Sequence, residues 1–142
     1  MNAKRLYFAA LFAFIIVALF YGPISQPQEY HDFADDREIL GIPNALDVMS
    51  NLAIIYPGVV GLAFVHESRK LSKVSEDEIS IQITLFSGMI LTFAGSVWFH
   101  LDPTDSTMLW DRLGMSVVIG SCISLLIHDM WDRNLAAKIH LP

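Results

Sequence analysis

Three side chains in the second half of the sequence, Ser96, His100 and Asp111, are of the types that bind a metal ion. Ser96 and His100 are four residues apart, a spacing that places them on one face of a helix. Asp111 follows after ten residues, 101–110, and so short a link favours two antiparallel neighbouring helices. Zinc accepts histidine nitrogen and carboxylate oxygen, and a catalytic site keeps one position for water. The spacing therefore predicts a partial zinc site where the two helices meet.

Each of these residues also has a purely structural interpretation. Ser96 can bond back to a carbonyl of its own helix, and His100 can be an interfacial residue. Asp111 can favour the start of a helix, beside Arg112. Three ligands at most also leave the shell short for a metal that prefers four. The residue types leave both interpretations open.

The elements that must position these residues are membrane-spanning helices. The 142 residues are 54% hydrophobic and only 17% charged, which is typical of a chain in lipid. A bilayer core about 30 Å thick requires roughly 20 mostly apolar residues in a helix. Four runs satisfy this requirement: 6–22, 46–65, 79–99 and 109–127. We therefore expect an all-α bundle of about four transmembrane helices, forming a single membrane domain over residues 1–142.

Two of these runs have boundary signals. The first run ends at Gly22-Pro23, where proline would interrupt a helix. A cleaved signal peptide is the alternative interpretation, but the apolar stretch is long for one and no A-x-A cleavage site follows. The third run is preceded by a capping-box pattern from Ser75 to Glu78, which is typical of a helix start.

The distribution of Lys and Arg predicts the orientation, because cytoplasmic loops hold the excess of both. With the N-terminus inside, seven of the nine fall in the cytoplasm: Lys4, Arg5, Arg69, Lys70, Lys73, Arg133 and Lys138. Only Arg37 and Arg112 then lie outside. This predicts a multi-pass protein of a bacterial inner membrane with both termini cytoplasmic and an outer polar segment at 23–45. The net charge of −6 is concentrated in the outer segments, so nothing suggests binding to nucleic acid.

The sequence around the candidate site resembles a known family. GSVWFHLDPTDSTMLWDRLGM, residues 95–115, resembles the core signature of the alkaline ceramidase-like family of the CREST superfamily of membrane hydrolases. That signature has a G-S-x-x-x-H helix end followed by a helix start with aspartate. LGIPNALDVMSNLAIIYPGVVGL, 40–62, and YHDFADDR, 30–37, resemble the preceding segments of its bacterial members. The resemblance covers about residues 30–128 and implies the N-terminal part of a seven-helix fold.

This resemblance implies a zinc-dependent hydrolase that cleaves an amide bond in a membrane lipid such as ceramide. In the family, the serine, histidine and aspartate of these motifs belong to the zinc site, and they match Ser96, His100 and Asp111. Asp111 would act as the acid and base, and Ser96 would stabilise an oxyanion or position the water.

The resemblance also implies a possible calcium ion. The family's animal members hold calcium near the start of the chain with carboxylates and an amide. Asp32, Asp35 and Asn44 are the positions that match best. The structural alternative is that this acidic stretch is simply solvated, although oxygen ligands of this kind suit calcium.

The sequence departs from the family pattern because it has no H-x-x-x-H, the pair with which a late helix completes the family's zinc shell. His128 lies seventeen residues beyond Asp111, roughly 25 Å along a helix. His66 and His140 are expected on the cytoplasmic side, and nothing in the sequence brings His31 to the site. Three interpretations of this chain follow. It is an incomplete relative of the family, or it is a half-module whose zinc shell is completed by a second chain or by a copy of itself. The third is a non-catalytic membrane scaffold that keeps the polar residues for helix packing.

Overall fold

The computed structural model describes residues 24–71 and 74–130, together with residues 9, 12, 13, 16, 17 and 20. The chain divides into two compact units, Met1–Tyr30 and His31–Pro142. Six residues of the predicted span 6–22 are described, and they are helical; the rest of that predicted span lies outside the described residues.

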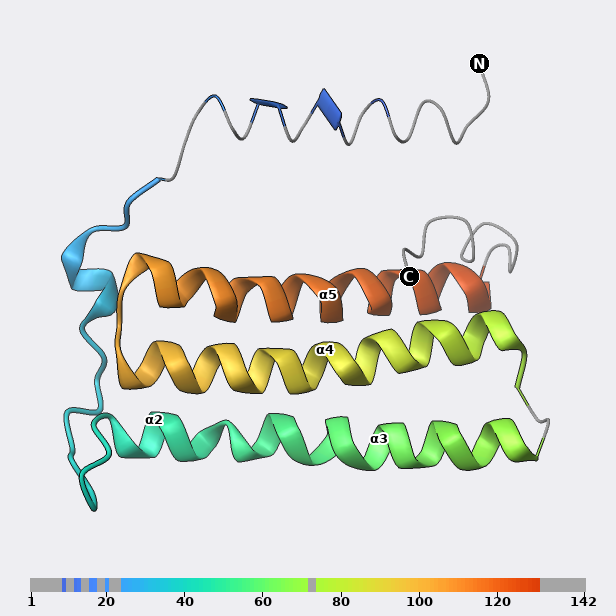
Figure 1. Cartoon of the computed structure of the whole chain (residues 1–142), viewed down its shortest axis with the longest axis horizontal. Helices are drawn as coiled ribbons and strands as arrows, with labels where there is room; N and C mark the ends of the chain where they lie inside the picture. The colour runs from blue at the N-terminus through green and yellow to red at the C-terminus, as the bar shows by residue number, and fades with distance from the viewer. Residues whose placement is uncertain are drawn as a thin grey trace. The chain divides into compact units, whose positions relative to one another are not determined.

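The second unit contains the long helices. A short 3₁₀ helix, η1 (Gln28–His31), leads into it, and α2 (Ala45–Ser50), α3 (Leu52–Lys70), α4 (Glu76–Leu101) and α5 (Asp105–Met130) follow (Figure 1). The described residues contain no β-strand, only an isolated bridge between Ile39 and Ile42.

Among the described residues, three helical stretches are long and apolar enough to cross a membrane: Ala45–Lys70, which joins α2 and α3, then Glu76–Leu101 and Asp105–Met130. Each has 26 residues, so each is about 39 Å long and exceeds the hydrocarbon core of a bilayer. The predicted spans 46–65, 79–99 and 109–127 fall inside these three stretches. The protein is therefore an all-α membrane protein, as the sequence predicts.

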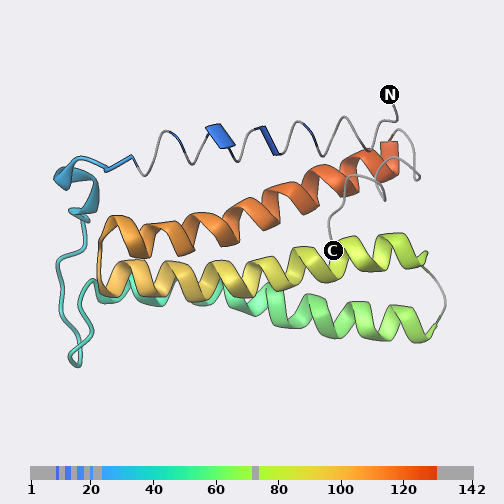
Figure 2. The same ribbon diagram turned by 45° about the horizontal axis from the view of Figure 1, so that its top comes forward.

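Helix α4 lies between α3 and α5 (Figures 1 and 2). Over the described residues, α3 and α5 do not contact each other, so α4 alone connects them. The predicted helix start before α4 is confirmed, because the Ser75 side chain accepts a hydrogen bond from Glu78 N at 3.3 Å. The acidic residues Glu76 to Glu78 occupy the first turn, where they complement the helix dipole.

Small residues allow α4 to approach its neighbours closely. A Cβ atom at Gly95 would lie 2.5 Å from the Trp110 carbonyl, and one at Gly114 would lie 2.5 Å from the Thr92 backbone. On the other side of α4, the Phe86 ring lies where a Cβ of Gly61 would be. Helices in lipid associate mainly through such close packing, because burial of apolar side chains provides little driving force there.

We expect Gly95→Ala to lower the thermal unfolding midpoint of the protein in detergent, followed by circular dichroism. The added methyl must push apart two helix backbones, and overpacking of this kind costs about 1–3 kcal/mol. Gly120→Ala is the matched control on α5, because nothing lies within 4 Å of its added Cβ. Equal midpoints for the two variants would contradict the close contact between α4 and α5.

Candidate functional site

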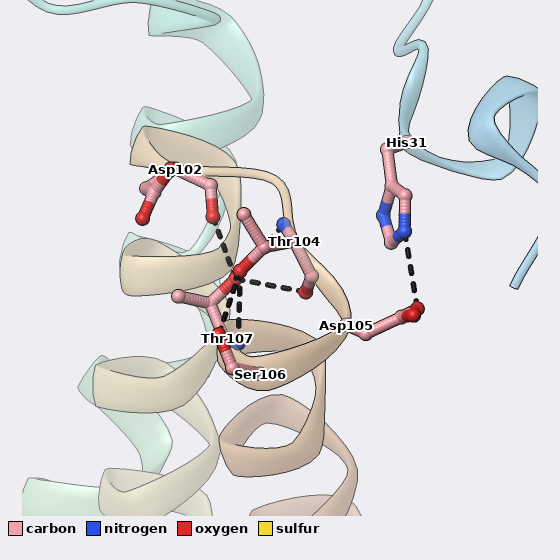
Figure 3. A network of polar contacts seen from close by, with 6 residues as sticks. All are labelled: His31, Asp102, Thr104, Asp105, Ser106 and Thr107. Atoms are coloured by element: carbon pink, nitrogen blue, oxygen red, sulfur yellow. Dashed lines mark hydrogen bonds and ion pairs between the residues drawn. The ribbon is translucent and has the colours of Figure 1, made fainter. Parts of the chain in front are cut away.

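The end of the bundle where α4 passes into α5 is held by a compact hydrogen-bond network (Figure 3). The Thr107 hydroxyl donates to the carbonyl oxygen of Asp102 at 2.6 Å and accepts from Thr104 N at 3.1 Å. The Thr104 hydroxyl in turn accepts from Thr107 N at 3.3 Å. This reciprocal arrangement pairs the free N–H groups at the start of α5. It therefore helps to hold the end of α4 against the start of α5.

Ser96 and Asp111 lie at the same level of the bundle. Gly95, the residue before Ser96, packs against the Trp110–Asp111 peptide, with its Cβ position 2.7 Å from Asp111 N. Ser96 is buried, with 8% of its surface exposed, and Asp111 is half-buried. This contact fixes the level of Asp111 relative to Gly95 and Ser96, whereas the convergence of Ser96, His100 and Asp111 on one site stays a prediction.

His100 lies one turn further toward the loop, where it meets α2. Its Nδ1 atom is buried and has no hydrogen-bond partner among the described residues. The Oδ2 atom of Asp47, on α2, lies 4.0 Å from this nitrogen. The Phe33 ring covers the imidazole, with the ring centres 4.6 Å apart. His100 is thus enclosed by residues that come from before and within α2.

Residues 31–44 fold onto this same end of the bundle. His31 is buried, and its Nε2 atom lies 3.2 Å from the Asp105 carboxylate at the start of α5 (Figure 3). The edges of the His31 and Phe33 rings meet Phe99, with centre distances of 5.7 and 5.3 Å. Nothing in the sequence predicts that His31 reaches this end. The contact joins two residues that are 74 positions apart in the chain, and no local pattern encodes such a contact.

Two of the three residues predicted to bind calcium anchor the segment 31–44. The buried Asp35 carboxylate accepts from Leu46 N at 2.8 Å, at the start of α2, and from Arg37 Nε. Asn44 donates through its amide to the His100 carbonyl at 2.8 Å, whereas Asp32 is exposed. The guanidinium of Arg37 disfavours a cation at the Asp35 carboxylate, because like charges repel. A calcium ion here stays a prediction.

The hydrogen bond from Arg37 holds the pKa of Asp35 below its usual value, helped by the backbone N–H of Leu46. Because the ionised carboxylate is favoured in the folded state, its stabilising contribution is present above the unfolded pKa of about 3.9. It is lost as the pH falls through the lowered pKa of the folded state.

We therefore expect Asp35→Asn to lower the unfolding midpoint at neutral pH and to flatten its decline below pH about 4. The measurement is thermal unfolding in detergent across a pH series. Asp36→Asn, an exposed neighbour of the same charge, should behave as the wild type. Parallel pH profiles for wild type and Asp35→Asn would contradict the anchoring role of Asp35.

An apolar groove adjoins the site on α4 and α5. It has a volume of about 220 Å³ and is lined by Leu91, Ala94, Gly95, Trp98 and Trp110. The two tryptophan rings are stacked, with their centres 6.2 Å apart. Tryptophan favours the interface between lipid and water. Because Gly95 and Trp110 belong to its lining, the groove places an apolar surface beside the contact that sets the level of Asp111 on α5 relative to Gly95 on α4.

The other histidines lie away from this end or outside the described residues. His128 is buried near the far end of α5, where its Nδ1 atom lies 3.3 Å from the Asp129 carboxylate. His66 is exposed near the end of α3, and His140 lies outside the described residues. In the described part of the chain, no group of three or more His, Cys, Asp or Glu side chains is arranged to hold a metal ion.

Comparisons with known proteins add no relative. No family model matches the chain, and no curated protein or solved structure matches it.

Proposed function

We propose that this protein carries the zinc-binding end of a membrane hydrolase that cleaves an amide bond in a lipid such as a ceramide. The observation that carries the proposal is the buried Nδ1 atom of His100, which has no hydrogen-bond partner among the described residues. It lies at the end of the bundle where Gly95 aligns Ser96 with Asp111. A buried histidine nitrogen without a hydrogen-bond partner can bind a metal in the tautomer that leaves this nitrogen unprotonated. The resemblance of residues 30–128 to ceramidase-like hydrolases also supports this function.

In this proposal the three predicted residues have separate roles. His100 would hold the metal, which would polarise the substrate carbonyl and lower the pKa of a bound water towards about 7. The Asp111 carboxylate, half-buried at the depth of Ser96, takes a proton from the attacking water and returns it to the leaving amine. The buried Ser96 hydroxyl donates a hydrogen bond to the oxygen that gains negative charge.

The apolar groove supports a lipid as the substrate. Its lining is contributed by the same two helices, and Gly95 belongs both to the groove and to the contact that sets the depth of Asp111. An acyl chain lying in this groove would stay in an apolar environment while the polar part of the lipid meets the site.

The described residues supply fewer ligands than zinc prefers, so in this proposal a second copy of the chain completes the site. The competing function is a non-catalytic membrane scaffold. The observation that favours it is the close packing at Gly95 and Gly114, which would need these helices whether or not a metal is bound.

We expect the purified wild type to contain stoichiometric zinc by elemental analysis, and His100→Ala and Asp111→Ala to lose most of it. His100→Ala removes the proposed ligand, and Asp111→Ala removes the carboxylate of the predicted zinc site, so both should weaken metal affinity. Ser116→Ala, on the exposed surface of α5, is the control and should keep its zinc. A wild type without zinc would exclude the hydrolase function and leave the scaffold.

We also propose that the protein lies in a bacterial inner membrane, with segment 31–44 outside and both termini in the cytoplasm. The support is the excess of Lys and Arg in the cytoplasmic segments that this orientation creates. Arg69 and Lys70 end α3, at the opposite end of this helical stretch from Asn44.

Cysteine labelling tests this orientation in a Cys122→Ser background, which removes the protein's single cysteine. In intact spheroplasts, a membrane-impermeant maleimide should label an Asp36→Cys variant at once. A Glu67→Cys variant should be labelled only after the membrane is permeabilised. The reverse pattern would show that the protein has the opposite orientation.

A further inference from the structure

We infer that Asp47 of α2 binds the same zinc ion as His100, Asp47 through Oδ2 and His100 through Nδ1. The inference rests on the proposed zinc site and adds to it a ligand from another helix. Asp47 lies in the apolar run that the sequence identifies only as a membrane span. It meets His100 because α2 packs against α4.

The distance between the two atoms suits a shared metal better than a hydrogen bond. His100 Nδ1 and Asp47 Oδ2 are 4.0 Å apart, whereas hydrogen bonds to nitrogen are about 2.7–3.2 Å long. Two ligands of a tetrahedral zinc ion, each bound at about 2.0–2.1 Å, lie about 3.4 Å from each other. A movement of about 0.6 Å in the side chains therefore brings both atoms into the zinc shell.

The burial of the Nδ1 atom favours its binding to a cation. The His100 side chain is 20% exposed and that of Asp47 is 35% exposed, so both are partly removed from water. A buried polar nitrogen without a partner is costly, and a metal bond would satisfy it. The nearby carboxylate adds the negative charge that a divalent cation requires.

The backbone around both residues is already held in place. Ser50 Oγ and Asn51 Nδ2 donate to the Asp47 carbonyl at 2.7 and 2.9 Å, across the junction of α2 and α3. On α4, the His100 carbonyl accepts from Asn44 at 2.8 Å. These contacts use only the main-chain oxygens of Asp47 and His100. Their side chains are thus placed opposite each other by a scaffold that does not depend on the metal.

Together, Asp47 and His100 would fill two of the four positions of a tetrahedral zinc ion. One of the remaining positions would stay open to water, and the other would take a ligand from the second copy. The described residues hold no cluster of three His, Cys, Asp or Glu side chains, so the pair by itself is an incomplete zinc shell.

The experiment is a zinc titration of the full chain in detergent, after removal of metal by a chelator. Affinity is measured by competition with a chromophoric chelator for wild type, Asp47→Asn and the control Asp36→Asn. Asp47→Asn is isosteric and keeps the main-chain carbonyl that Ser50 and Asn51 bind. We expect its Kd for zinc to rise at least about tenfold, as for a lost ligand or ligand partner, and Asp36→Asn to match the wild type.

Cobalt substitution supplies a second readout that does not depend on affinity alone. The visible absorption of bound Co²⁺ should change in Asp47→Asn and also in Asp47→Glu, which keeps a carboxylate on a longer side chain. If Asp47→Asn does not fold, Asp47→Glu tests whether Asp47 is a ligand. A cobalt spectrum of Asp47→Glu identical to that of the wild type would overturn the inference.

The outcomes separate this inference from the proposed function. Zinc bound equally well by wild type and Asp47→Asn, with identical cobalt spectra, would show Asp47 to be only a neighbour of His100 and would leave the zinc site standing. A wild type that binds no zinc would overturn both proposals.

Discussion

The close approach of α4 and α5 is the constraint on which the rest of this structure depends. At Gly95 the two helices are so near that a single Cβ atom would collide with the Trp110 carbonyl, and at Gly114 the same is true of the Thr92 backbone. In lipid, such contact must come from shape, since apolar side chains gain little by leaving the acyl chains. The contact also sets the level of Asp111 against Ser96, so packing and site geometry have one cause.

The polar segment before α2 depends on this helix pair. Its buried groups, His31 and Asp35, contact Asp105 and Leu46, and Asn44 binds the last turn of α4 through the His100 carbonyl. Each contact pairs a helix-terminal or buried polar group that would otherwise lack a partner away from water. The segment is therefore part of the folded bundle end, and it delivers α2, with Asp47, to the side of His100.

The chemistry proposed for this end follows from what the packing leaves unpaired. Thr107, Thr104 and Asp102 satisfy one another in the loop, and Asp35 is paired with Arg37. The Nδ1 atom of His100 is buried without a hydrogen-bond partner in the described part of the chain, as are Ser121 Oγ and His128 Nε2 further along α5. A cation between His100 and Asp47 would pair this nitrogen, and the apolar groove along α4 and α5 indicates where a lipid would approach.

The sequence by itself determined the features that depend on neighbours along the chain. Three apolar runs, the Ser75 cap and the short link before Asp111 are local patterns. The described part of the chain contains three long apolar helices, with α4 and α5 side by side. The apolar run at 6–22 lies largely outside the described residues, so a membrane span there stays a prediction. Only the tertiary structure decided that His31 contacts Asp105, that Asp35 and Asn44 anchor the segment 31–44, and that Asp47 faces His100. These contacts join residues far apart in the chain, and they depend on how each helix is rotated and how closely it packs. Hydropathy and capping patterns specify neither quantity, because they report only which face of a segment is apolar and where the segment ends.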